Sequence, residues 1–492
     1  MATIFRYDDI VGSNIIRVSG DNVCTLNEVH QADINATCIN EHSLNSGGSG
    51  YVAGDTFTIN GTTNPYPASG VVDTVDGTGA VLTYTLNTFG DGYAITTGQT
   101  TTGGTGTGLA IDIISLKPWG VVQKDGDYNY TLKCPILITQ DVDFRIGFVF
   151  HETLTFDYGS NANVYVLQYF GGANGVLRIG RYVNTSSSYL NNYSAHIQSR
   201  VSDRLNNRIY MVGQVLVANS LFTNFQYGYL YGSSTQPSEA RSTIFSDFHF
   251  GLATNFYTSV YDCQFFGGFY GCQFNGADIV DGVLIERCQI GLIHAVTGAG
   301  NYYFRNLKMN YITSGTYTYI RRGSNEKKIY FIDSQILGEG LGWYGSIIGT
   351  TIQYNEQFLQ STFNFKINNE DGDNLEGVDI KVYNVKEELV HSGTSDINGE
   401  DSEVLSYYRK YFTGTATETL EDGQESLEPF KIIISKNGYE TVEIKDLEVV
   451  SGIPTNIKTT LKKTAPLLID SNGETHIRFN KENIGDNREL IS

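Results

Sequence analysis

A short phrase that returns along the middle of the chain constrains the fold more than any other feature. Two apolar residues are followed by two mostly polar ones, and then by a small or apolar, a polar and an apolar residue. The copies are "LFTNFQYG" from Leu221, "IFSDFHFG" from Ile244, "SVYDCQFF" from Ser259, "LIERCQIG" from Leu284, "YFRNLKMN" from Tyr303 and "YFIDSQIL" from Tyr330. The alternation at the end of the phrase has a period of two, which is typical of a strand with one buried face.

The fifth residue of each copy is an anchor from which the spacing can be measured. The steps between anchors vary around twenty residues, which favours a solenoid of strands joined by turns of changing length. In a parallel β-helix the anchors would point inward and stack as one column, with the following polar residues as an outer ladder. A β-sandwich with chance similarity is the alternative. The anchors are Phe225, Phe248, Cys263, Cys288, Leu307 and Ser334.

The cysteines follow the repeat without suggesting a metal site. Cys263, Cys272 and Cys288 each precede a glutamine. Their spacing is not the Cys-x2-Cys of a structural zinc site, and no histidine pair completes one. Six cysteines in 492 residues are also too few for a disulfide scaffold. We therefore predict buried thiols, no metal and no cofactor.

Composition and charge exclude several classes of protein. Gly, Tyr and Phe are abundant and only 17% of the residues are charged, which suits short strands and polar turns. The net charge of -20 disfavours binding to nucleic acid. No run of 18 apolar residues predicts a membrane span, and the N-terminus has no signal-peptide pattern. We expect a soluble chain made in a cytoplasm, with no membrane insertion.

Residues 45–115 differ from the repeat in composition and in sequence pattern. "GGSGYVAGDTFTING" begins at Gly47 and "GDGYAITTGQTTTGGTGTG" begins at Gly90, so Gly-x-Gly-Tyr precedes a Thr-rich strand twice. Glycine permits turns with positive φ, while Thr, Val and Tyr favour strands. The segment resembles a small Gly-x-Gly-Tyr β-module of tail and decoration proteins from tailed bacteriophages.

From Thr362 onward the sequence resembles another family. "FNFKINNEDGDNLEGVDIKVYN" is followed by "HSGTSDINGE" and "PFKIIISKNGYETVEIKDLEV". Gly377-Val378, the turn from Thr394 to Gly399 and the hairpin from Lys436 to Tyr439 match the carboxypeptidase-regulatory-like or transthyretin-like family. That resemblance implies a non-catalytic, immunoglobulin-like β-sandwich. The acidic insert "ATETLEDGQESLEP" departs from the family pattern and is expected to be a solvated loop.

Together these segments predict an all-β chain with a central parallel β-helix. The first strands, including "NIIRVSGDNVCTLNEVH", are a candidate first coil, and the tail contains a predicted strand from Glu474 to Phe479. The expected parts are N-terminal strands in 1–44, the β-module in 45–115, the β-helix in 116–358, the sandwich in 359–464 and an extension in 465–492.

The sequence gives little indication of catalytic residues or of a ligand-binding site. Glycan-cleaving enzymes need two carboxylates about 5 to 9.5 Å apart, and Asp247 and Asp262 would be about 5 Å apart if they lay on adjacent coils. A polar ladder beside a turn explains both residues more simply. Tyrosine-rich stretches such as "FQYGYLYG" can stack on sugars or simply pack. The histidines, expected on the surface or satisfied in the core, are His30, His42, His151, His196, His249, His294, His391 and His476.

The combined resemblances imply a structural protein of a tailed-bacteriophage virion: a tail fibre, spike or head fibre involved in host attachment. The expected partners are other virion proteins, two further copies in a homotrimer, and a glycan or protein receptor on the host surface. No catalytic residue is assigned, and the binding residues are unknown. A glycan depolymerase and a bacterial surface adhesin are the alternatives.

Overall fold

The computed structural model is nearly all β-structure, as the composition predicts. Contacts divide it into two compact units. Unit 1 contains Met1–Gly298, Lys308–Ser324 and Ile336–Thr350, and unit 2 contains Ala299–Leu307, Asn325–Gln335 and Thr351–Ser492. The structure describes residues 2–7, 14–62, 64–158, 164–181, 194–200, 206–233, 235–255, 257–275, 279–294, 300–312, 319–322, 327–338, 345–348, 352–414, 423–464, 468–469 and 475–476.

Three sheets of unit 1 are built by strands that recur in turn along the chain. Sheet 1 contains β1 (Thr3–Tyr7), β2 (Ile15–Ser19), β12 (Ile136–Gln140), β15 (Val164–Gly171), β18 (Asn207–Val212), β21 (Tyr227–Tyr231), β24 (Phe250–Asn255), β27 (Tyr270–Asn275), β30 (Ile290–His294), β33 (Tyr319–Arg322) and β36 (Gly345–Ile348). Sheet 2 contains β10 (Val122–Lys124), β11 (Asn129–Leu132), β14 (Glu152–Phe156), β17 (Ala195–Ser199), β20 (Ser220–Thr223), β23 (Ile244–Ser246), β26 (Gln264–Phe266), β29 (Leu284–Glu286), β32 (Lys308–Ile312) and β35 (Gln335–Gly338). The strands of sheet 3 that lie in unit 1 are β3 (Val23–Thr25), β13 (Asp143–Ile146), β16 (Val176–Ile179), β19 (Gln214–Ala218), β22 (Ser238–Arg241), β25 (Thr258–Tyr261) and β28 (Ile279–Asp281).

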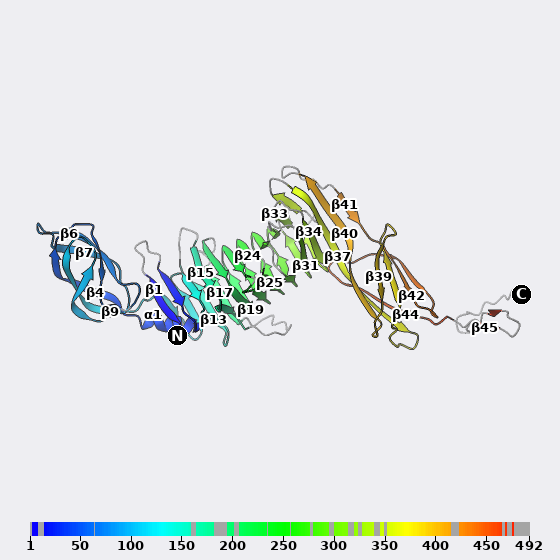
Figure 1. The fold of residues 1–492 in the computed structure, drawn as a ribbon, viewed down its shortest axis with the longest axis horizontal. Coiled ribbons are helices and arrows are strands. Elements are labelled where there is room, and N and C mark those ends of the chain that lie inside the picture. The colour runs from blue at the N-terminus through cyan, green and yellow to red at the C-terminus, as the bar shows by residue number, and fades with distance from the viewer. Residues whose placement is uncertain are drawn as a thin grey trace. The chain divides into compact units, whose positions relative to one another are not determined.

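One strand of sheet 3, one of sheet 2 and one of sheet 1 follow one another from β13 onward, and we call such a triplet a rung. Each strand pairs in parallel with the equivalent strand of the next rung, as β20 does with β23 and β23 with β26. Figure 1 shows these strands side by side in succession from cyan to green. Equivalent side chains therefore stack: the ring of Phe245 is 5.1 Å from that of Phe222 and 5.0 Å from that of Phe265.

The first strands join the stack directly, since β2 pairs in parallel with β12 and β3 with β13. The end of the candidate first coil is helical instead of extended, because Thr25 and Glu28 form a capping box that begins α1 (Leu26–Ile34). Asp33 near the end of α1 is buried, and its carboxylate accepts backbone hydrogen bonds from Gly120, Val121 and Val122. This carboxylate ties the chain before the β-module to the chain after it.

The module between these points is one antiparallel sheet with its own core. Both Gly-x-Gly-Tyr motifs place a buried tyrosine beside a turn with positive φ at Gly50 and Gly92. The hydroxyl of Tyr93 donates to the carbonyl of Ile59 at 2.8 Å. The strands are β4 (Cys38–Ser49), β5 (Thr56–Ile59), β6 (Ser69–Val75), β7 (Val81–Thr88), β8 (Thr96–Thr102) and β9 (Thr107–Lys117).

Unit 2 is organised around the long strand β37 (Ile352–Asn369), which pairs with β40 (Glu400–Gly414) and β44 (Thr455–Leu461). A second sheet, β39-β38-β42-β43, shares its core with β37. Glu356, whose side chain is 3% exposed, lies 3.0 Å from the Lys328 ammonium and also pairs with Arg409. The remaining strands of unit 2 are β31 (Gly300–Arg305), β34 (Lys327–Ile332), β38 (Asp379–Tyr383), β39 (Leu389–Thr394), β41 (Gly423–Ser426), β42 (Phe430–Ser435), β43 (Val442–Leu447), β45 (Leu468–Ile469) and β46 (Thr475–His476).

Part of the predicted tail strand is present, because β46 pairs with β45; Glu474 and residues 477–479 lie outside the described residues. Half of the acidic insert, residues 416–422, also lies outside them, and Gly423–Ser426 forms β41, which pairs with β40, so this part of the insert is a strand and not the expected loop. Among the helices that the structure describes, none is long and apolar enough to span a membrane.

Candidate functional site

In the four successive rungs from β19 to β30, each rung contains two equivalent turns in which one residue adopts a left-handed backbone. The first turn joins sheet 3 to sheet 2, and the second joins sheet 2 to sheet 1. Asparagine, aspartate and glycine dominate because they tolerate positive φ best. The first turn column is Asn219, Ser242, Asp262 and Gly282, and the second is Asn224, Asp247, Gly267 and Arg287.

Asp247 and Asp262 do not occupy equivalent turns of adjacent rungs, so the carboxylate pair that the sequence raised as an alternative to a polar ladder does not arise from stacking. Strand register places Asp247 beside Gly267 in the second column, after the pair Ser246 and Phe266. Asp262 lies in the first column beside Gly282. The phrase of the repeat occurs at both turns of a rung, so a step of fifteen residues between its copies is less than one rung.

The surroundings of the two aspartates differ accordingly. Burial raises the pKa of Asp262, the nearby charge of Asp281 raises it further, and Arg241 opposes both effects. Asp247 lies in a column with Asn224 and Gly267. The two residues are turn formers, and their positions do not bring together a pair of carboxylates.

The anchors are all buried, as predicted, but they form more than one column. Cys263 follows the first turn, Cys288 follows the second, and Cys272 lies within β27 between Leu252 and Leu292. All six cysteines lie among the described residues as buried thiols without a disulfide, and burial raises the pKa of Cys263 to about 12. No group of three or more His, Cys, Asp or Glu side chains that could hold a metal occurs in the described part of the chain.

Arg287 is the unusual member of the second turn column, since it is neither glycine nor a short polar residue. Its φ is 56° and its side chain is 76% exposed. We expect Arg287→Gly to stabilise unit 1 by about 0.5–1 kcal/mol, because relief of left-handed strain exceeds the entropy that glycine adds to the unfolded chain. Urea unfolding measures this, with Ile279→Gly at the exposed start of β28, also in unit 1, as the destabilising control. A lower midpoint for Arg287→Gly would contradict the strain argument.

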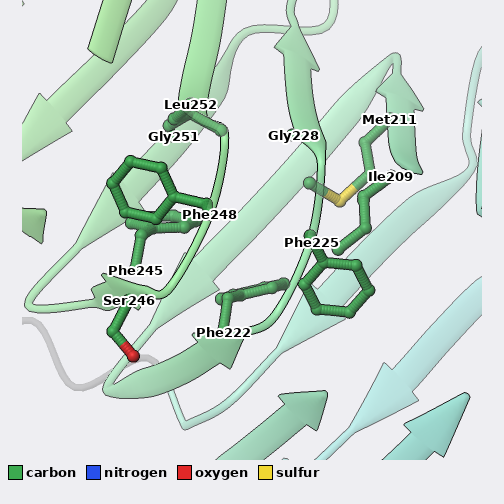
Figure 2. A pocket seen from close by; sticks show the side chains of 10 residues that line it. All are labelled: Ile209, Met211, Phe222, Phe225, Gly228, Phe245, Ser246, Phe248, Gly251 and Leu252. Carbon is green, nitrogen blue, oxygen red and sulfur yellow. The ribbon is translucent and has the colours of Figure 1, made fainter. Parts of the chain in front are cut away.

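A small cavity lies inside the rungs, with a volume of about 20 Å³. Figure 2 shows Phe245 and Phe248 on one side of it, Phe225 and Met211 on the other, and Phe222 below. Such a space holds at most about one water molecule, and its lining is almost wholly apolar. It is a packing defect and not a ligand site.

The outer face of sheet 1 carries a larger cluster of aromatic side chains. Alternation in β18 buries Ile209 and Met211 and turns Tyr210 outward. The ring of Tyr210 is 5.4 Å from that of Tyr165 and 5.6 Å from that of Tyr229. We call this cluster the aromatic strip: Tyr165, Phe170, Tyr210, Tyr227, Tyr229 and Tyr231.

A cation is built into the aromatic strip. The guanidinium of Arg208 lies 4.9 Å from the ring centre of Tyr227 and 5.8 Å from that of Tyr165. Its Nε donates to Gln226 at 2.6 Å, which fixes its position. Burial raises the pKa of Tyr229, and the neighbouring tyrosines add to this effect. The strip is thus a surface of uncharged phenols beside one cation, suited to stacking contacts and hydrogen bonds.

Several histidines have ordinary side-chain partners. A ring nitrogen of His42 is 2.7 Å from the hydroxyl of Tyr84, one of His196 is 3.1 Å from that of Thr223, and one of His391 is 2.7 Å from Asp401. Burial lowers the pKa of both His42 and His196. These contacts describe packed side chains.

Comparison with known proteins assigns no family to the chain. No protein-family model matches it, and no curated protein matches it. A mutant of the shaft pilin spaA from Lactobacillus rhamnosus GG matches with 12% identity and a TM-score of 0.15, covering 21% of this chain and 48% of the pilin. A 3-chlorocatechol 1,2-dioxygenase from Rhodococcus opacus 1CP matches with 17% identity and a TM-score of 0.15, covering 21% and 59%.

The TIE protein of Bacillus anthracis matches with 16% identity and a TM-score of 0.14, covering 25% of this chain and 20% of that protein. The chain thus spans less than two thirds of the length of each of these proteins. Likenesses of this size assign neither fold nor function.

Proposed function

We propose that this chain is a structural protein of a tailed-bacteriophage virion, a tail fibre, spike or head fibre that takes part in attachment to the host surface. We infer that sheets 1, 2 and 3 of unit 1 form a parallel β-helix. We infer further that the sheets of unit 2 form an immunoglobulin-like sandwich of the transthyretin-like kind. The resemblances of residues 45–115 and of the segment after Thr362 support this assignment.

The rung-by-rung parallel register is the observation that carries the proposal. Backbone hydrogen bonds link each strand to the equivalent strand of the next rung, as Phe222 pairs with Phe245 and Phe245 with Phe265. Each bond therefore runs along the stack, and a local deformation must break several of them together. Such a structure is stiff and resists proteases, which are the properties that an exposed virion component needs.

The aromatic strip supplies the surface for attachment. Its rings lie on three neighbouring strands, β15, β18 and β21, so a partner lying across these strands meets rings on each of them. Adjacent strands are about 4.8 Å apart. Rigid aromatic side chains lose little conformational entropy on binding, which favours them as contact residues.

The association state of the full chain tests the proposal. Light scattering is expected to give three times the mass of one chain, with SDS-resistant bands on the same sample. The double substitution Tyr210→Ser and Tyr229→Ser should leave that mass unchanged, because the strip is proposed to face the host and not another copy. Tyr303→Ser, at an exposed tyrosine of β31 outside the strip, is the control.

Two results would contradict parts of the proposal. A monomer without SDS resistance would refute the trimeric fibre. A trimer that dissociates only in the double variant would show that the strip is a contact between subunits, and would refute its role in attachment.

A further inference from the structure

A second hollow in unit 1 has the size of a ligand site. Its volume is about 430 Å³, within the usual range for pockets that bind small molecules. The turn between β10 and β11 and the turn between β13 and β14 form much of its wall. We call it the N-terminal pocket, and the residues that matter here are Lys124, Tyr128, Arg145, Phe148, Phe150 and Glu152.

Aromatic side chains of the N-terminal pocket are exposed to solvent although they are largely apolar. The ring of Tyr128 stacks on that of Phe150, with centres 4.7 Å apart and planes inclined by 25°. Phe150 is 55% exposed, and its neighbour Val149 is 69% exposed. Exposed apolar groups gathered at one hollow mark a binding surface more often than scattered ones do.

Backbone strain at Tyr128 is an independent sign of function. Its φ is 62°, in the left-handed region where the Cβ atom crowds the carbonyl oxygen. Asparagine or glycine would be favoured there on stability alone. Strained residues that persist tend to cluster at binding sites. Here the strained backbone presents the ring that stacks on Phe150.

The charges of the pocket are balanced and already positioned. The Lys124 ammonium is 3.3 Å from the side-chain oxygen of Asn27, and Arg145 pairs with Asp143 at 2.6 Å. Glu152 accepts a hydrogen bond from the backbone of Gly147 at 2.6 Å. The lining contains two cations, Lys124 and Arg145, and two acidic residues, Asp127 and Glu152, so a ligand with a large net charge would gain little.

We propose that the N-terminal pocket binds a pyranose ring of an uncharged carbohydrate. One face of such a ring is formed by C–H groups, which can stack on the Tyr128–Phe150 pair. Its edge carries hydroxyls that both donate and accept, which suits the mixed charged groups Lys124 and Glu152. This site is separate from the aromatic strip and does not rest on the proposed function.

The full-length chain can be titrated with methyl glucoside, methyl galactoside, methyl mannoside and methyl N-acetylglucosaminide, with binding followed by saturation-transfer NMR. At least one of them is expected to bind saturably. Tyr128→Asn should weaken that binding about tenfold through loss of the stacking contact, without lowering the melting temperature. Asparagine tolerates the left-handed backbone, so this variant removes the ring and relieves the strain together.

Tyr257→Asn is the matched control, because Tyr257 is also a left-handed tyrosine, with φ of 64° and 44% exposure, and does not line the pocket. It should bind like the unmodified chain. Phe150→Ala, at an exposed position, should weaken binding as Tyr128→Asn does. Saturable binding that survives both pocket variants would overturn the proposed site. Binding of none of the four glycosides, or tighter binding of methyl glucuronide than of methyl glucoside, would overturn the proposed ligand class.

Discussion

Asp33→Ala is expected to destabilise the first part of unit 1 by about 3–5 kcal/mol. The side chain is 1% exposed, and its carboxylate accepts from three successive backbone amides, those of Gly120, Val121 and Val122. Truncation would leave these donors buried without an acceptor, and each such group is costly. Hydrogen bonds to a charged acceptor are also stronger than neutral ones.

Amide hydrogen exchange at Gly120, Val121 and Val122 measures this effect at the residues concerned. Exchange there should accelerate by several orders of magnitude, while the amides of unit 2 keep their protection. Asp21→Ala, at an exposed position, is the control and should alter stability by less than about 0.5 kcal/mol. Unchanged protection at Val121 in the Asp33 variant would show that water or another group replaces the carboxylate.

Phe265→Ala should destabilise the stack of rungs by about 3–5 kcal/mol, the usual range for a fully buried phenylalanine. The side chain is 0% exposed, and its ring lies 5.0 Å from Phe245 and 6.3 Å from Phe248. Both partners line the internal cavity, so the deletion would add empty space to a region that already contains some. Collapse of the neighbouring rungs is opposed by the backbone bonds on both sides.

Urea unfolding monitored by near-ultraviolet circular dichroism checks this prediction, with each transition analysed separately because two units need not unfold together. Phe269→Ala is the control, since Phe269 is 36% exposed and lies only four residues away. The midpoint of one transition should fall strongly for Phe265→Ala and little for Phe269→Ala. Equal shifts in the two variants would refute the burial argument.

Residue patterns predict the secondary structure of this chain well, because the relevant signals are local. Period-two alternation at the end of each phrase identifies strands, and buried anchors such as Cys263 and Leu307 lie where the alternation places them. The Gly-x-Gly-Tyr motifs predict turns with positive φ, and Gly50 and Gly92 have them. The capping box of α1 was equally readable from Thr25 and Glu28, but the strand-rich composition concealed it.

The register of the rungs was not predictable in the same way. The first and second turns of a rung share one local sequence pattern. Aligning the copies of the repeated phrase therefore equates residues that lie at different corners of the rung. Spacing identifies residues of the same turn, because Ser242, Asp262 and Gly282 follow one another at intervals of twenty residues and form one series. Asp247 belongs to the other series, and only non-local strand pairing shows this directly.

The two groups of exposed aromatics differ in how far the sequence reveals them. Alternating tyrosines in "FQYGYLYG" indicate the aromatic strip, although the contribution of Tyr165 and Arg208 depends on pairing across strands. The N-terminal pocket has no such signature. Tyr128 and Phe150 are twenty-two residues apart in the sequence, and no periodicity connects them. Their meeting depends on how β11 and β14 pair.

Because both turn columns repeat once in every rung from β19 to β30, the stack can change its length only by whole rungs. Removing or adding residues within a rung would displace every later strand from its partner, whereas removing a complete rung, such as 262–281, joins two equivalent left-handed corners. Each rung adds one strand spacing of about 4.8 Å to the stack. The stack can therefore lengthen or shorten over generations by duplication or loss of about sixty nucleotides, with the strands on either side of the changed rung left intact.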